Sequence, residues 1–216
     1  MTVKKHIVCF GDSNTHGYCA DIADTESHSD RFTENERWTC LLQKKLGDDY
    51  LVIEEGLSGR TTVFSDPLHE SMSGLDSIYS CLMSHEPVDL LIIMLGTNDC
   101  KERLGQNPAC IGLGMDRLIY KAQTIPCWGE KGPNILIISP PYMREGFSDE
   151  VMGLCCVEKS ALIAPYFEQH AKERGCAFLD AEGVAEFNKV DFTHLSKKGH
   201  AQLSEKLAEI VPDLVR

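Results

Sequence analysis

A serine stands just after a short apolar run near the start of the chain, in the segment CFGDSNTHGY at residues 9–18. The run, residues 6–10, predicts a buried strand that stops at Gly11, so Ser13 falls in the tight turn leaving the sheet. A serine hydroxyl can act as a nucleophile there, but only when a base takes its proton. Taken alone, Ser13 is better explained as a turn or helix-capping residue, and Asp12 as a carboxylate that holds the turn. A nucleophilic role therefore requires a base elsewhere in the chain.

His194 is the histidine with a carboxylate at a useful spacing. The chain has eight histidines, and in the segment DFTHLS Asp191 stands three residues before His194, ahead of the last predicted helix. A short bend in this segment would let the carboxylate bond the imidazole and fix its tautomer. The pattern D-x-x-H is weak by itself, because a surface pair before a helix has the same spacing. Its place after the fifth predicted strand makes it a candidate base.

Acyl transfer also needs hydrogen-bond donors where an oxyanion develops. Gly59, in the segment LSGRTT, can offer an unobstructed backbone N–H, and Asn98, in LGTND, can offer its side-chain amide. The N–H of Ser13 is a third candidate. Each residue is also an ordinary turn residue, so the argument depends on their occurring together, each after a successive strand.

Five apolar runs predict the strands that must position these residues, at 6–10, 50–56, 89–95, 134–140 and 176–180. Helical periodicity lies between and after them, at 37–47, 74–87, 111–126, 152–175 and 196–215, with Pro165 expected to kink or divide the fourth segment. Strands that alternate with helices predict an α/β fold with a parallel sheet. Ligands bind at the carboxyl ends of such strands, and that is where the candidate residues fall.

Composition limits the partners of this chain. Its 216 residues suit one domain, 1–216, and a net charge of -12 argues against nucleic acid or an anionic membrane surface as a partner. The ten cysteines are scattered without a C-x-x-C pair, which favours buried reduced thiols over a disulfide framework. No apolar run approaches the roughly 20 residues of a membrane helix. We therefore expect a cytoplasmic protein.

These motifs together resemble the SGNH (GDSL-type) hydrolases. GDS at the first strand, a glycine after the second, G-x-N-D after the third and D-x-x-H before the last helix follow that family's four-block pattern. Further segments are similar to the arylesterase and acyltransferase (perhydrolase) branch: RWT at 37–39, EEGLSGRTT at 54–62, DP at 66–67, IIMLGTND at 92–99 and SPP at 139–141. The resemblance covers essentially the whole chain.

The resemblance implies a flavodoxin-like three-layer α/β/α sandwich whose five parallel strands have the order 2-1-3-4-5. It implies Ser13 as nucleophile, His194 as general base and then acid, and Asp191 as the residue that orients His194. Ser13, Gly59 and Asn98 would form the oxyanion hole, with no metal or organic cofactor. Relatives in this branch assemble into homo-oligomers, so the resemblance also suggests a homo-oligomer here.

The chain departs from the family at two positions after the nucleophile. Asn14 replaces the leucine of GDSL, and His16 stands where the branch often has tryptophan. We expect both to bind substrate as walls of the acyl pocket, where they would alter acyl preference and the ratio of hydrolysis to transfer.

The predicted function is a serine esterase that hydrolyses small, short-acyl carboxylic esters through an acyl-enzyme on Ser13. An acyltransferase or perhydrolase would use the same acyl-enzyme. A non-catalytic ligand-binding module remains an alternative from another class, because the same sheet hosts many functions. A phosphate-binding interpretation of the glycine loops ranks last, since the chain lacks a P-loop lysine and a G-x-G-x-x-G.

Overall fold

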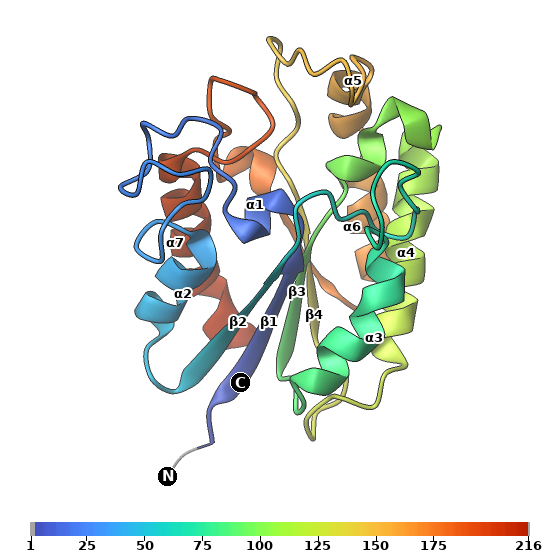
Figure 1. Ribbon diagram of the computed structural model, residues 1–216. Coiled ribbons are helices and arrows are strands. Elements are labelled where there is room, and N and C mark those ends of the chain that lie inside the picture. Colours follow the sequence, from blue (N-terminus) through green and yellow to red (C-terminus); the bar gives the residue numbers. More distant parts are fainter. Residues whose placement is uncertain (1–2, 216) are drawn as a thin grey trace.

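The five apolar runs form one parallel sheet in the computed structural model, which describes residues 3–215 (Figure 1). Its strand order is β2-β1-β3-β4-β5, which confirms the order that the family resemblance implies. Each strand pairs in parallel with its neighbours. The strands are β1 (Lys5–Gly11), β2 (Tyr50–Gly56), β3 (Leu90–Met94), β4 (Ile135–Ser139) and β5 (Ala177–Asp180).

Both faces of the sheet are covered, which explains why the central strands are apolar throughout. Successive side chains of a strand point to opposite faces. Ile7 and Cys9 of β1 therefore belong to one buried cluster, and Val8 and Phe10 to the other. In β3 and β4 every residue is buried. The core thus consists of two apolar layers with the sheet between them.

Seven α-helices are described. Figure 1 shows α2 and α7 on one face of the sheet, and α3, α4 and α6 on the other. The packing agrees, since Trp38 and Leu203 join one apolar cluster while Ile78, Leu118 and Phe167 join the other. The helices are α1 (Ser13–His16), α2 (Trp38–Leu46), α3 (Gly74–Ser84), α4 (Pro108–Gln123), α5 (Cys156–Ser160), α6 (Ala164–Glu173) and α7 (Lys197–Leu214).

One helical prediction is confirmed and another is wrong at its start. The fourth helical segment is divided, as Pro165 indicates: α5 ends at Ser160 and α6 begins at Ala164, with the proline in its first turn. The helix α4 begins at Pro108, three residues before the predicted start, because Asn107 caps it by accepting from the Cys110 N–H at 2.9 Å.

The carboxyl ends of the strands lie at one edge of the sheet, at the top of Figure 1, beside α1 and the longer loops. The segments that follow β1, β2 and β3 therefore converge there. Within residues 3–215, no helix has both the length and the apolarity required to cross a bilayer.

Candidate active site

Ser13 opens α1, the single turn of helix that follows β1. Asp12 caps this turn with its carboxylate, which accepts from the Asn14 N–H at 2.9 Å, as the sequence indicates. Glycine is required where the turn meets the sheet, since a Cβ on Gly11 would lie 2.0 Å from Thr15 Oγ1. Burial raises the pKa of Asp12 to about 6, against the lowering effect of the Asn14 N–H. The Asp12 hydrogen bond and the close packing at Gly11 fix the turn against the end of β1.

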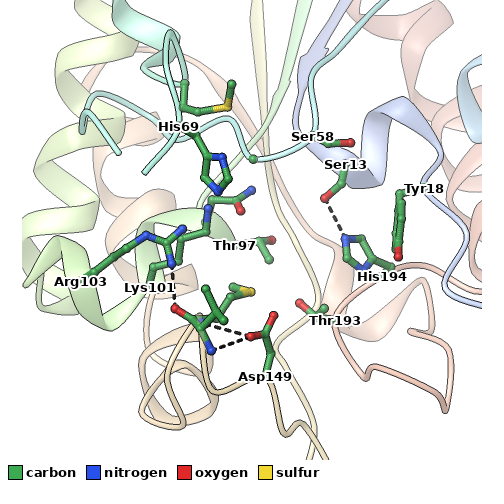
Figure 2. Close-up of a pocket in the computed structure, with 15 residues that line it drawn as sticks. Ser13, Tyr18, Ser58, His69, Thr97, Lys101, Arg103, Asp149, Thr193 and His194 are labelled. Atoms are coloured by element: carbon green, nitrogen blue, oxygen red, sulfur yellow. Dashed lines mark hydrogen bonds between the residues drawn. The ribbon is translucent and has the colours of Figure 1, made fainter. Parts of the chain in front are cut away.

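His194 lies on the segment between β5 and α7, beside Ser13. Its Nε2 is 2.9 Å from Ser13 Oγ (Figure 2). Its Nδ1 is 2.6 Å from Asp191 Oδ2. A carboxylate can only accept, so Nδ1 carries the imidazole proton and the neutral ring presents Nε2 as an acceptor to the serine hydroxyl. The structure thus brings together three residues that are up to 181 positions apart in the chain.

Asp191 is held by the bend that carries it. Its Oδ1 accepts from the backbone N–H groups of Thr193 and His194, each at 3.1 Å, and from the Asn188 side-chain amide at 2.9 Å. Burial raises the pKa of this carboxyl, but the His194 hydrogen bond and charge outweigh it and leave the pKa at about 2. Asp191 is therefore ionised at neutral pH. Asn188 was not anticipated from the sequence, where it stands outside the D-x-x-H pattern.

Tyr18 is a second residue that the sequence did not reveal. Its ring packs against the His194 imidazole, with centroids 4.5 Å apart and planes at 55°. Figure 2 shows it beside His194, on the side away from Ser13. Tyr18 comes just after α1, so the turn that presents the serine also presents this ring.

Gly59 and Asn98 lie beside Ser13, at the ends of β2 and β3. Gly59 has a φ of 92°, in the left-handed region that favours glycine. The Asn98 side-chain amide donates to the Arg60 carbonyl at 3.2 Å and to Asp12 Oδ2 at 3.4 Å. Gly59, Asn98, Ser13 and His194 all line one cavity of about 570 Å³. Two candidate donors therefore share an open space with the serine and the histidine.

A buried carboxylate joins the two turns that carry these donors. Asp99 accepts from the Thr62 N–H at 2.9 Å and from Thr62 Oγ1 at 2.5 Å. Burial raises the pKa of Asp99 to about 6, while both Thr62 hydrogen bonds lower it. The position of Asn98 is thus linked to the loop that follows Gly59.

The far side of the cavity is polar and charged. Figure 2 shows His69, Lys101 and Arg103 across from Ser13 and His194, with Asp149 near them. Lys101 and Arg103 both bind Asp66 Oδ2, at 3.1 and 2.7 Å, and the Asp66 side chain is completely buried. This ion-pair network forms the charged wall of the cavity.

The expectation that Asn14 and His16 line the acyl pocket is corrected by the structure, since neither borders this cavity. The Asn14 side chain is buried and bonds the backbone of Thr193 and Leu195, on either side of His194. His16 lies at the end of α1, and its backbone packs against Gly56 of β2. A Cβ added to Gly56 would lie 2.2 Å from the backbone nitrogen of His16. Position 14 faces the histidine segment because α1 makes only one turn.

Comparison with known proteins places this fold among ester hydrolases. The model of the GDSL-like Lipase/Acylhydrolase family matches residues 9–202. An aryl esterase from M. smegmatis shares 35% identity at a TM-score of 0.87, over 97% of this chain and 99% of that one. A carbohydrate acetylesterase family member from Sinorhizobium meliloti shares 34% identity at a TM-score of 0.87, over 98% and 99%. The search of curated proteins found no match.

Proposed function

The chain belongs to the GDSL-like Lipase/Acylhydrolase family, and on that premise we propose that it is a serine esterase that hydrolyses small, short-acyl carboxylic esters through an acyl-enzyme on Ser13. The observation that carries the proposal is the continuous series of contacts from Asp191 to His194 to Ser13, at 2.6 and 2.9 Å, at the edge of an open cavity.

Acylation begins when Ser13 Oγ attacks the ester carbonyl and His194 Nε2 takes the hydroxyl proton. The ionised Asp191 stabilises the imidazolium that forms. The leaving alcohol receives the proton from His194, and the acyl group stays on Ser13. Water then attacks the acyl carbonyl while His194 takes its proton, and the acid leaves as His194 returns that proton to Ser13 Oγ.

The tetrahedral oxyanion of each step would receive the N–H groups of Ser13 and Gly59 and the Asn98 amide. Asn98 supports this role because its amide already lies beside the serine turn, 3.4 Å from Asp12 Oδ2. Its hold on the Arg60 carbonyl keeps it in place before substrate arrives. An oxyanion would take the amide hydrogen that now makes the long contact to Asp12, while the bond to the Arg60 carbonyl stays in place.

The proposed substrates are acetyl or similarly short esters of aryl alcohols or carbohydrates. Relatives with about a third of their residues identical are named as an aryl esterase and a carbohydrate acetylesterase family member. The polar wall with His69, Lys101 and Asp149 supports an alcohol portion that carries hydroxyl groups. A long aliphatic chain would exclude water from those polar groups, at a cost in free energy.

The test compares initial rates on p-nitrophenyl acetate, butyrate and octanoate for the wild type and Ser13→Ala. We expect acetate to be turned over fastest and Ser13→Ala to lose roughly 10⁴- to 10⁶-fold in kcat, as nucleophile removal does in other triads. Ser80→Ala, on the exposed side of α3, is the matched control and should keep wild-type rates.

The acyl-enzyme itself is tested by quenching the reaction in acid and measuring the mass of the intact protein. One added acyl group, located on the Ser13 peptide and missing in Ser13→Ala, supports the mechanism. If the acyl group passes from Ser13 to an added alcohol or peroxide in preference to water, the chain is an acyltransferase or a perhydrolase. Wild-type rates in Ser13→Ala would reject Ser13 as the nucleophile. No turnover by either protein would reject simple ester hydrolysis and favour a binding module.

A further inference from the structure

Three side chains that commonly bind metal ions meet between β2 and α3, outside the cavity that Ser13 borders. They are Glu55, Cys81 and His85, and one ligand atom from each lies within 4.8 Å of the other two. Glu55 Oε1 and His85 Nε2 are 2.7 Å apart. A carboxylate, a thiol and an imidazole are the ligand types that Zn²⁺ takes in proteins.

Local structure explains why the three converge. Cys81 and His85 are four residues apart at the end of α3, so they lie on the same face of the helix. Glu55 and Ile53 point to the same face of β2, since they are two residues apart. Ile53 packs in the apolar layer on the α3 face of the sheet. Neighbouring Glu54 points to the other face and pairs with Arg37 instead.

The backbone of the cluster is anchored. Glu55 is paired in register with Phe10 in the sheet. The His85 N–H donates to the Leu82 carbonyl and closes the helix, while the His85 carbonyl lies 3.2 Å from His6 Nδ1. A cation would therefore meet ligands on two fixed elements, and only their side chains would need to adjust.

The spacing suits a tetrahedral ion. Zn–N and Zn–S bonds of about 2.0 and 2.3 Å place neighbouring ligand atoms roughly 3.3–3.6 Å apart. The Glu55–His85 contact of 2.7 Å would open by about 0.6 Å, and the widest separation in the cluster, at most 4.8 Å, would close by no more than about 1.2 Å. The His85 and Glu55 side chains are 26% and 31% exposed, so an ion and a water molecule as fourth ligand can reach them.

Charge balance also favours a dication. Cys81 is only partly exposed and carries a thiol that is not in a disulfide. A bound dication would displace the thiol proton to solvent, leaving a thiolate and a carboxylate whose two negative charges match the charge of the ion. The centre formed by the ion, the thiolate and the carboxylate would then be neutral.

We propose that Glu55, Cys81 and His85 form a binding site for a single soft divalent cation of the Zn²⁺ type, separate from the ester-hydrolysing site. The alternative is that Glu55 and His85 form an ordinary ion pair that fastens α3 to β2, with Cys81 beside them by packing. Participation of the thiol distinguishes the two.

The test titrates the full-length, reduced protein with Zn²⁺ by calorimetry and with Co²⁺ by absorption spectroscopy. We expect one ion per chain and, with Co²⁺, the charge-transfer band of a thiolate ligand. Loss of a residue that only supports a metal ligand typically weakens metal affinity roughly 10- to 100-fold. Loss of a ligand itself should cost more, so we expect each of Glu55→Gln, Cys81→Ser and His85→Gln to weaken affinity at least about 100-fold. The thiolate band should vanish in Cys81→Ser.

Cys110→Ser is the matched control, because Cys110 is also a partly exposed thiol but lies on α4. It should keep both the affinity and the band, and circular dichroism should show every variant folded. Wild-type protein that binds no ion would overturn the site. Binding that all three variants retain would also overturn the site, because the ion would then be held by other residues. A Co²⁺ complex of the wild type without a thiolate band would overturn it as well.

Discussion

Asn14 and Thr193 join the two halves of the site, since the Asn14 side-chain amide donates to the Thr193 carbonyl at 3.3 Å. Asn14 follows Ser13, and Thr193 precedes His194. The Asn14 Oδ1 also accepts from the Leu195 N–H at 2.8 Å, so the side chain spans the backbone around His194. The Asn14–Thr193 hydrogen bond therefore helps to set the distance between Ser13 and His194, in addition to the direct contact between those two side chains.

Asn14→Ala should lower kcat by roughly 10- to 100-fold while KM changes little. The variant leaves the Thr193 carbonyl and the Leu195 N–H without their buried partner, a cost of about 1–3 kcal/mol that the histidine segment would relieve by moving. Steady-state rates on p-nitrophenyl acetate and a thermal melt would measure both effects. Wild-type kcat in a folded Asn14→Ala protein would show that the bridge does not position His194.

Asn98→Ala should lower kcat by roughly 10²- to 10³-fold, because it removes one donor to the oxyanion. The loss should be similar for acetate and butyrate esters, since the oxyanion is common to both. Asn107→Ala is a useful control, because it removes the cap of α4 far from the cavity and should cost stability but not kcat. An unchanged kcat in Asn98→Ala would remove this residue from the proposed mechanism.

Tyr18→Leu should lower kcat/KM by roughly 2- to 30-fold, and Tyr18→Phe should stay near the wild type. The ring face lies beside the imidazole, which becomes a cation in the transition state, and such a contact is worth about 0.5–2 kcal/mol. Phenylalanine keeps the ring and loses only the hydroxyl. If the phenylalanine variant loses as much as the leucine variant, the hydroxyl rather than the ring is the contributing group.

The fold could be predicted from the sequence because its signals are local. β3 and β4 are uninterrupted apolar runs, and a run of that kind survives only between two covering layers. The start of α4 at Pro108 was missed although its signals are local too, an asparagine cap followed by proline. Apolar periodicity starts only at Ile111, one turn later.

The site was predictable only in part, for a physical reason. Ser13, Asp191, His194, Gly59 and Asn98 each follow a strand, so the topology of a parallel sheet places them at one edge. The partners of Asn14 are a backbone carbonyl and a backbone N–H about 180 residues away, and every residue of the chain except proline offers both groups. No sequence pattern marks such a contact.

Asp66→Ala should reduce the free energy of unfolding by about 3–5 kcal/mol, because it leaves the Lys101 cation buried without a counter-charge. The Asp66 side chain is 0% exposed and the Lys101 side chain 6% exposed. Chemical denaturation would measure the loss, and exposed Asp48→Ala should change stability by no more than about 0.5 kcal/mol. Adding Lys101→Met to Asp66→Ala should restore part of the loss. Similar stability for Asp66→Ala and the wild type would contradict this account of the wall.

His200 should make the protein less stable in mild acid. It is completely buried on α7, where its Nδ1 accepts from the Trp38 N–H at 3.2 Å and Nε2 has no partner among residues 3–215. Burial, reinforced by the Arg37 charge, lowers the pKa of His200 to about 3. The unfolded chain takes up a proton near pH 6.5 and the folded chain does not, so this residue's contribution to stability falls as pH drops from about 6.5 toward 3.

His200→Asn tests this, since asparagine places an acceptor near the Trp38 N–H but does not titrate. Between about pH 4 and pH 6, the stability of the wild type relative to the variant should fall by up to about 1.4 kcal/mol for each pH unit of acidification. Asp12 and Asp99 have raised pKa values and an opposite pH dependence, but they are present in both proteins and cancel in the difference. Urea unfolding at several pH values gives the slopes, with exposed His28→Gln as a control that should match the wild type. Parallel slopes for the wild type and His200→Asn would mean that His200 is not the residue that resists protonation.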